Sequence, residues 1–367
     1  MPIAEQRGGA EQALVHLLEA EPGSVDWIVT FLEPGDLARR FQERGIQVEV
    51  LRAGRLRNGV RYLRTVLELA EQARVAHVDL MFAWMSKSQL YVGPAALLAG
   101  VPSGWYQMGI PSRRSWLERL ATLLPAVGVV ACSHGVAVAQ QGMWPRRKVP
   151  IVELGADLSQ FDTGRLPSTG LARRELGLPL EGPLIGIVGR LQRWKGMHLL
   201  IEAMPSILRE HPDTTTVIVG GVHAREPNYS AELRQQISNL GLDGRVIIAG
   251  FQSNVPLWMQ AMDVVVHASD CEPFGIVLIE AMALGKPVVA TNRGGPLELI
   301  TDDVDGLLWE SGNVKSLARQ VLRCLEEPGL SSRLGRKAAV RARHFSSSGY
   351  ARRLTETFAT LAVAAGK

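Results

Sequence analysis

Two glutamates that flank a Pro-Phe-Gly sequence are the residues best suited to chemistry. Glu272 and Glu280 stand eight positions apart in CEPFGIVLIEAMALG, residues 271–285. The apolar run DVVVHAS before them predicts a strand, which puts Glu272 in the loop where that strand ends. The following residues predict a helix that begins after Gly275 and ends at Gly285, with Glu280 on its second turn. A buried acid needs a polar partner. A ribose diol would serve Glu280, and a structural bond to a core amide is the alternative.

The start of this predicted helix adds a site for an anion. Amides of the first helical turn have no intrahelical acceptor, so those of Gly275, Ile276 and Val277 are free for a ligand. A glycine at 275 also permits close approach of the backbone. In a continuous helix the two glutamates would lie about 12 Å apart along the axis. The break between loop and helix instead lets both side chains reach one ligand.

A second loop carries two cations. GRLQRWKG, residues 189–196, follows the apolar run PLIGIVG and matches neither the P-loop pattern nor G-x-G-x-x-G. Arg190 offers a planar fork of donors and Lys195 a point charge, a combination that suits a diphosphate. Two exposed basic side chains on a loop are the alternative interpretation.

The elements that must position these residues are short apolar runs that alternate with helical stretches. Such alternation predicts parallel sheets covered by helices on both faces. The predicted strands cover residues 26–32, 46–51, 77–83, 103–107, 127–132, 149–154, 183–189, 215–221, 245–251, 263–269, 286–291 and 305–309.

This pattern predicts two Rossmann-like domains that face each other across a cleft, the place where ligands of such sheets bind. The turn-rich residues 155–170 suit a linker, and we place the domains at 1–160 and 161–345. The closing residues 346–367 predict an amphipathic helix that packs back on the first domain. Only MPIA precedes the first loop, so the first strand is either very short or begins upstream of this sequence.

Composition limits the class of protein. At 367 residues, about two domains are expected, and no apolar run approaches the roughly 20 residues that span a bilayer. The first residues lack the basic and apolar regions of a signal peptide. Cys132, Cys271 and Cys324 lie far apart, without C-x-x-C spacing, and read as reduced thiols. We therefore expect a cytoplasmic protein.

Three basic patches in the sequence could bind an anionic partner. The first holds Arg52, Arg55, Arg57, Arg61 and Arg64, the second is RRSWLERL at 113–120, and the third is WPRRK at 144–148. These patches would suit anionic lipid headgroups at the inner face of a membrane, or an acidic acceptor. Solvated helix faces are the alternative. The net charge of +4 gives no reason to expect nucleic-acid binding.

Taken together, the motifs resemble those of a known family over nearly the whole chain. EPFGIVLIE resembles the E-x7-E motif of retaining glycosyltransferases of the GT-B fold, family 4. Four further segments follow in that family's order: RGGAEQALVHLL resembles its first loop, LGADLSQF its linker, GRLQRWKG its diphosphate loop, and EAMALGKPVVATNRGGPLELI its closing helix, strand and GG-x-x-E. The resemblance implies an acceptor domain at 1–160, with 346–367 packed on it, and a nucleotide-sugar domain at 161–345.

The resemblance also implies a role for each matching residue. Glu272 would hold hydroxyls of the donor sugar and Glu280 those of the ribose, while Arg190 and Lys195 would neutralise the diphosphate. The remaining implied contacts are the amides of Phe274, Gly275 and Ile276 around the sugar, the first-loop glycines Gly8 and Gly9 near the diphosphate and acceptor, and Gly294, Gly295 and Glu298 along the far wall.

The chain departs from the family in two places. Family members often carry a histidine after the fourth strand, near the donor sugar, where this chain has Gln107 in GWYQMG. Glutamine forms hydrogen bonds but cannot become cationic, so the donor preference is open. Leu154 replaces the usual asparagine of the linker motif. His134, in CSHGVAV, could serve as a base, although a capping or surface histidine fits its position better.

The residues and the resemblance together predict a retaining hexosyltransferase. It would move a hexosyl unit from a UDP- or GDP-linked sugar to an acceptor hydroxyl, in glycan or glycolipid biosynthesis. Arg190, Lys195 and the helix amides would stabilise the leaving diphosphate. No carboxylate pair is placed for double displacement, and no D-x-D lies near the predicted cleft loops, so we expect neither a metal nor another cofactor. An isomerase or hydrolase on the same fold is the alternative, whereas an oxidoreductase would need the absent G-x-G-x-x-G. Nucleobase, sugar, acceptor and oligomeric state stay open.

Overall fold

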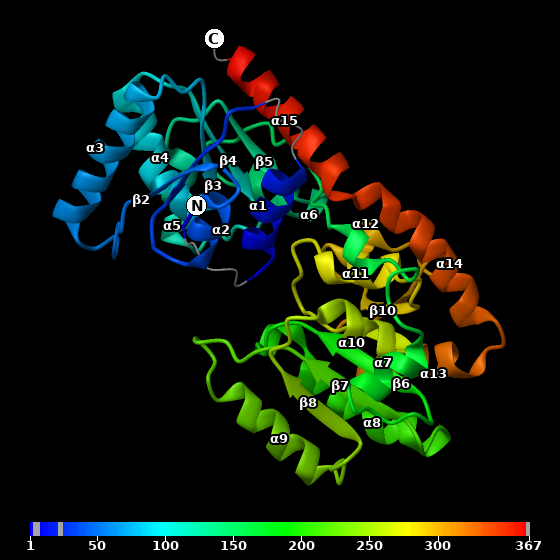
Figure 1. Ribbon diagram of the computed structural model, residues 1–367. Coiled ribbons are helices and arrows are strands. Elements are labelled where there is room, and N and C mark those ends of the chain that lie inside the picture. Colours follow the sequence, from blue (N-terminus) through cyan, green and yellow to red (C-terminus); the bar gives the residue numbers. More distant parts are fainter. Residues whose placement is uncertain (3–7, 21–24, 365–367) are drawn as a thin grey trace. The chain divides into compact units, whose positions relative to one another are not determined.

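The structure is a computed structural model that describes residues 1–2, 8–20 and 25–364. The chain divides into two compact units (Figure 1). Unit 1 consists of Met1–Gly155 and Ser347–Lys367, and unit 2 of Ala156–Ser346. The chain therefore passes from one unit to the other twice.

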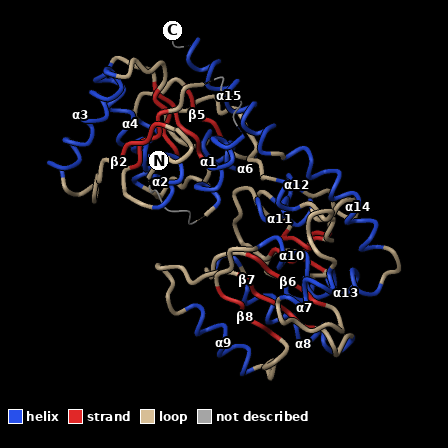
Figure 2. Tube along the Cα trace, in the orientation of Figure 1, coloured by secondary structure: helices blue, strands red, loops and turns tan. Residues whose placement is uncertain are grey.

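Unit 2 is built on a parallel sheet of six strands with the order β11-β10-β9-β6-β7-β8. Figure 2 draws the strands in red and labels β6, β7 and β8 of this sheet. The strands are β6 Leu184–Val188, β7 Thr215–Val219, β8 Val246–Gly250, β9 Val264–His267, β10 Val288–Thr291 and β11 Leu307–Trp309. This is the doubly wound order, in which chain direction across the sheet reverses between β6 and β9. Ligands of such sheets bind where these two strands end.

Helices cover this sheet in packed groups. They are α7 Thr169–Glu175, α8 Met197–Glu210, α9 Tyr229–Asn239, α10 Val255–Ala261, α11 Ile276–Ala283, α12 Pro296–Leu299, α13 Val314–Glu326 and α14 Leu330–Ala342, with 3₁₀ turns at Leu158–Phe161, Arg193–Lys195 and Arg343–Phe345. Helix α8 packs against α9 and α13, α7 against α10, and α11 against α14. The apolar residues of α8, α9 and α13 bury themselves against β6, β7 and β9 and form one core.

The strands of unit 1 pair in two separate sheets among the described residues. One is parallel β1 Ile28–Phe31 with β2 Gln47–Val50, and the other has the order β3-β4-β5, with β3 Met81–Trp84, β4 Ser103–Gln107 and β5 Gly128–Ala131. The predicted strand at 149–154 is wrong as a strand, because only Ile151 forms a bridge, to Ala131. Pro150 within that run has no amide to donate to a ladder.

Met1 lies beside β1, on the edge where a first strand would pair. Its amino group donates to the carbonyl of Thr30 at 2.9 Å, and its own carbonyl accepts from the amide of Leu32 at 3.1 Å. The predicted very short first strand is MPIA, of which residues 3 and 4 lie outside the described residues.

The closing helix, α15, belongs to unit 1. The helices of this unit are α1 Gly9–Ala20, α2 Asp36–Gln42, α3 Gly59–Val75, α4 Ser86–Ala99, α5 Trp116–Leu123, α6 His134–Gln141 and α15 Ser347–Ala364. Helix α15 packs along α1, as Figure 1 shows. The ring of Phe358 lies with its centroid 4.1 Å from that of Phe82 and 5.9 Å from that of Trp27. The return of the last helix to the first domain is thus observed.

We expect Phe358→Ala to lower the free energy of unfolding by about 3–5 kcal/mol, because it removes a buried aromatic ring and leaves a cavity. Urea unfolding followed by circular dichroism would measure the loss. Arg352→Ala, an exposed substitution on the same helix, is the control and should change stability little. Equal stability of the two variants would contradict the packing described here.

Candidate active site

Two loops meet where β6 and β9 end. The loop after β6 carries Arg190 and Lys195, and the loop after β9 carries Glu272. A side chain at Gly196 would place its Cβ 2.0 Å from the carbonyl oxygen of Ala268, so the two backbones touch. The amide of Asp270 donates to the carbonyl of Trp194 at 2.9 Å. The predicted cationic loop and the predicted acidic loop therefore form one surface.

Glu272 and Lys195 form an ion pair within this surface. The ammonium Nζ of Lys195 lies 2.5 Å from Oε2 of Glu272, and both side chains are largely buried. The same oxygen lies 3.2 Å from Nε2 of His267 and accepts from the hydroxyl of Ser269 at 3.3 Å. Burial alone would raise the pKa of Glu272, but Lys195 and His267 outweigh it and lower that pKa to about 2. Glu272 is thus held ionised.

Glu280 shows the opposite behaviour. It lies on α11, half-buried, and among the described residues its side chain forms no ion pair or hydrogen bond. Burial raises the pKa of its carboxyl to about 7. A carboxyl in this state gains from any donor that a ligand brings, because a donor favours the charged form.

The same two loops also carry Arg190 and lead into the start of α11. The guanidinium of Arg190 has no ion-pair partner among the described residues and is half-buried. Gly275 precedes α11 with φ of 110°, a conformation that favours glycine. The amide of Ile276 starts the helix and has no intrahelical acceptor. Phe274 is buried, and its ring meets that of Phe345 edge to face at 5.9 Å, so this residue anchors the loop.

The Gly-Gly pair lies directly beneath the loop of Glu272. A Cβ on Gly294 would lie 2.5 Å from the carbonyl oxygen of Glu272, and one on Gly295 would lie 2.1 Å from that of Phe274. The amide of Gly295 also donates to the carbonyl of Glu272 at 2.8 Å. Because these glycines have no side chains, the residues after β10 pack directly against the backbone of the loop that carries Glu272.

The remaining predicted residues lie in unit 1. The carbonyl of Gly8 accepts from the amide of Gln12, and Gly9 begins α1. Trp84, at the end of β3, donates from its indole to the carbonyl of Ala10 at 2.8 Å. The first loop therefore lies at the ends of β3 and β4, where Gln107 also lies.

Gln107 is held by an acid that the sequence did not single out. Its amide donates to Oε2 of Glu118 at 3.1 Å, and Ser86 donates to Oε1 of the same carboxylate at 2.8 Å. Burial raises the pKa of Glu118, an effect that these two hydrogen bonds reduce. The amide oxygen of Gln107 is buried and has no partner among the described residues. It is available to a donor.

Sequence reasoning also missed His267 and Ser269, which surround Glu272. The signal for His267 was present, because a histidine in the otherwise apolar strand DVVVHAS must find a polar partner once buried. The sequence also contains a D-x-D at 303–305, just before β11 and thus at the amino end of that strand. There Asp303 pairs with Arg323 and Arg333, and Asp305 accepts from the amide of Thr301.

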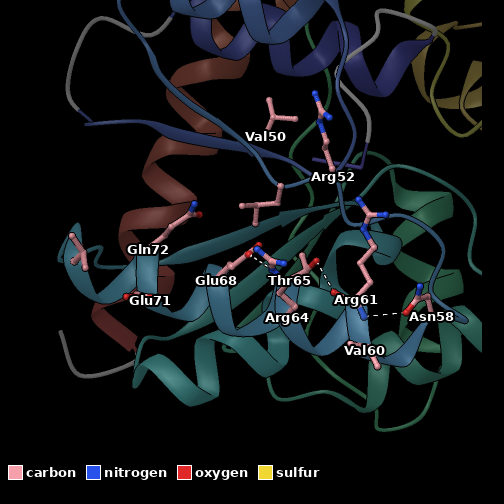
Figure 3. Close-up of a pocket in the computed structure, with 12 residues that line it drawn as sticks. Val50, Arg52, Asn58, Val60, Arg61, Arg64, Thr65, Glu68, Glu71 and Gln72 are labelled. Carbon is pink, nitrogen blue, oxygen red and sulfur yellow. Dashed lines mark hydrogen bonds and ion pairs between the residues drawn. The ribbon is translucent and has the colours of Figure 1, made fainter.

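The groove drawn in Figure 3 is elsewhere, in unit 1. It has a volume of about 970 Å³ and runs between the end of β2 and α3. Arg52, Arg61 and Arg64 of the first basic patch line it, but Glu68 pairs with Arg64 at 2.8 Å and Glu71 lines the same wall. None of the predicted site residues lies on this groove.

Comparison with known proteins assigns unit 2. Residues 169–341 match the family model of the glycosyl transferases group 1, a range that includes Arg190, Lys195, Glu272 and Glu280. This part of unit 2 is similar to the group 1 glycosyl transferases. The two loops described above lie within the matched residues.

Individual relatives extend the likeness over the rest of the chain. The lipopolysaccharide core biosynthesis glycosyltransferase LpsE of Rhizobium meliloti is 27% identical over 333 residues, 90% of this chain and 89% of that protein. The D-inositol 3-phosphate glycosyltransferase of Corynebacterium urealyticum is 32% identical over 220 residues, 59% of this chain and 52% of that protein. The chain thus spans about half the length of such D-inositol 3-phosphate glycosyltransferases.

The fold of the whole chain is also known from solved structures. Anabaena HepE, crystallised in complex with UDP-glucose, superimposes with a TM-score of 0.85 at 28% sequence identity, over 98% of this chain and 99% of that one. The chain therefore has the GT-B fold, as the resemblance implied.

We expect Gly294→Ala to destabilise the protein more than Gly312→Ala. Both glycines have φ of 70–80°, which costs about 1–2 kcal/mol for alanine, but nothing lies within 4 Å of a Cβ on Gly312. Alanine at 294 would also push the backbone of Glu272 away. Thermal unfolding of both variants would test this, and equal melting temperatures would contradict the close approach.

Proposed function

We propose that the protein is a retaining hexosyltransferase that uses a UDP-linked sugar and needs no metal ion. The observation that carries the proposal is the Lys195–Glu272 ion pair on a glycine-supported loop, beside the unpaired Arg190, within a group 1 glycosyl transferase domain. The likeness to HepE, whose structure contains UDP-glucose, favours UDP over GDP as the donor nucleotide.

In this proposal the bound donor separates Lys195 from Glu272. The diphosphate pairs with the ammonium of Lys195 and the guanidinium of Arg190. Glu272 instead accepts hydrogen bonds from hydroxyls of the sugar. His267 and Ser269 remain on Glu272 and keep it ionised. Sugar hydroxyls thus replace Lys195 as partners of Glu272, and the diphosphate gives Arg190 and Lys195 an anion to pair with.

The transfer itself builds negative charge on the leaving diphosphate. The bond between the anomeric carbon and the diphosphate oxygen breaks, and the acceptor oxygen bonds to the same face of that carbon. The acceptor proton passes to the leaving diphosphate. Lys195, Arg190 and the first amides of α11 stabilise this diphosphate, because they are oriented before the reaction starts.

Calorimetric titration with UDP, GDP and ADP in the presence of EDTA tests the donor site. We expect UDP to bind in preference to the others, and Lys195→Ala and Arg190→Ala each to weaken binding by about tenfold or more, the value of a charge-assisted hydrogen bond. Arg193→Ala is the matched control, because this cation of the same loop pairs with Glu232 instead. Preference for GDP would change only the identity of the proposed donor nucleotide. Binding that requires added Mg²⁺ would contradict metal independence.

Turnover distinguishes a transferase from a binding protein or a hydrolase. We expect slow hydrolysis of UDP-glucose, with water as a poor acceptor, to release α-glucose first, as proton NMR would show. Glu272→Gln should keep nucleotide binding and lose this turnover. Release of β-glucose would contradict retention, and rapid hydrolysis that no acceptor accelerates would favour a hydrolase.

Protonation of Glu280 should be linked to nucleotide binding. Ribose hydroxyls that donate to this carboxyl would lower its pKa below the value of about 7 in the free protein, so binding near pH 6.5 should release protons. Affinity should then fall with decreasing pH below 7, by up to about tenfold per pH unit. Calorimetry in buffers of different ionisation enthalpy would measure the released protons. Glu280→Gln is the control, since the diphosphate titrates equally in both proteins, and identical proton release would sink the assignment.

A further inference from the structure

One long segment of unit 1 is almost free of acids. Residues 80–152 contain seven lysines and arginines but a single acid, Glu118. That acid points inward, where Ser86 and Gln107 bind its carboxylate. Any charge that this segment shows to solvent is therefore positive.

Most of these cations are also unpaired. Lys87 pairs with Glu33 at 3.0 Å, and the guanidinium of Arg147 donates to backbone carbonyls. The other five are exposed and form no ion pair in the part of the chain that the structure describes. They are Arg113, Arg114, Arg119, Arg146 and Lys148.

Helix α5 presents apolar side chains among these cations. Trp116, Leu120 and Leu123 are 63%, 43% and 49% exposed and follow the i, i+4, i+7 spacing of one helix face. The opposite face of α5 is the buried one, with Ala121 and Thr122. On the surface of a monomeric globular protein, the outward face of a helix normally carries polar residues. The outward face of α5 carries apolar residues instead, which marks it as a contact surface.

The end of α6 and the residues that follow it pack beside α5. Gln140, on α6, donates to the hydroxyl of Thr122 on the buried face of α5 at 3.1 Å, and Arg147 donates to the carbonyl of Leu124 at the end of α5 at 3.0 Å. Arg113 reaches the other side, within 3.1 Å of where a Cβ on Gly142 would be. Here Trp144 is 74% exposed.

We propose that this surface docks on an anionic lipid bilayer. We define the basic-apolar face by its members: Arg113, Arg114, Trp116, Arg119, Leu120, Leu123, Trp144, Arg146 and Lys148. Arginines and lysines at its edge pair with anionic headgroups, and the tryptophans and leucines enter the boundary between headgroups and acyl chains. No helix of the described residues is long and apolar enough to cross a membrane, so the contact is peripheral.

The combination of side chains selects this partner. A polyanion in water would need the cations but would gain nothing from exposed Trp116, Leu120 and Leu123. A protein partner with an apolar groove would cover the apolar side chains but leave five cations desolvated or unpaired. The groove along α3 is a weaker candidate for lipid, because Glu68 and Glu71 stand among its arginines.

Co-sedimentation of the full chain with vesicles tests the proposal. Vesicles of phosphatidylcholine alone should bind little protein, and vesicles mixed with phosphatidylglycerol should bind most of it at low ionic strength. Added NaCl should weaken the binding, since surface charges are screened. Combined Arg113→Gln, Arg114→Gln and Arg119→Gln should reduce binding at least tenfold, and so should Leu120→Gln with Leu123→Gln.

The matched control lies on α14 in unit 2, which also exposes cations beside an apolar residue. Arg336→Gln, Lys337→Gln and Val340→Ser together should leave vesicle binding unchanged. The emission of Trp116 should shift to shorter wavelength on binding, and the shift should be smaller in Trp116→Phe. Melting temperatures would establish that each variant is folded.

Four outcomes would overturn the proposal. They are no binding to either vesicle, equal binding to both, loss of binding in the α14 variant that matches the loss in the α5 variants, and tighter binding to single-stranded nucleic acid than to anionic vesicles. The first three remove the lipid contact or its location, and the last would show that the cations serve another polyanion. None of them bears on the donor site, which lies in the other unit.

Discussion

A buried ionised carboxylate, that of Glu272, is the constraint on which the architecture of unit 2 depends. A single charge in such surroundings costs several kcal/mol unless cations and donors surround it. Lys195 supplies a cation from the loop after β6, while His267 at the end of β9 and Ser269 just beyond it supply the other contacts. This arrangement is reached only because Gly196 lets the two strand-end loops touch.

The two glutamates of one loop and helix show how environment separates the functions of identical side chains. Glu272 is fixed in its charged form by neighbours of the protein itself, whereas Glu280 is left without such neighbours and titrates near neutrality. One is a permanent acceptor of hydrogen bonds, and the other changes its charge with what binds beside it. Pairs of carboxylates with divergent pKa values are a common means of dividing roles within one site.

Much of unit 2 could be predicted from the sequence, because its parallel strands are buried on both faces and read as apolar runs between helices. The position of Lys195 and of Glu272 in loops that follow strands could be predicted from the apolar runs before them. The partners of these residues could not be predicted in the same way. A histidine in the apolar strand DVVVHAS signals that His267 needs a polar partner. Which partner it contacts, and that Glu118 contacts Gln107, depend on side-chain rotamers and helix packing, which no spacing in the sequence encodes.

Unit 1 was harder for a related reason. The run at 149–154 has the apolar character of a strand, yet Pro150 breaks the ladder and only one bridge forms. The division into β1–β2 and β3–β4–β5 also left no signal in the sequence, because the composition of a strand does not show which strands it pairs with. The exposed apolar face of α5 has the period of a buried helix, so its pattern alone predicts packing where the structure shows solvent.

The place of α15 has a consequence for the order in which the chain is made. Unit 2 occupies one continuous stretch, Ala156–Ser346, and can close its six-stranded sheet as soon as that stretch has left the ribosome. Unit 1 cannot do so, because Phe82 and Trp27 wait for Phe358, which is synthesised after all of unit 2. During translation the first half of the protein therefore exposes an apolar surface for the time that about two hundred residues take to assemble, roughly 10–40 s at the usual 5–20 residues per second. A nascent chain of this kind is a natural client for chaperones that hold unfinished domains.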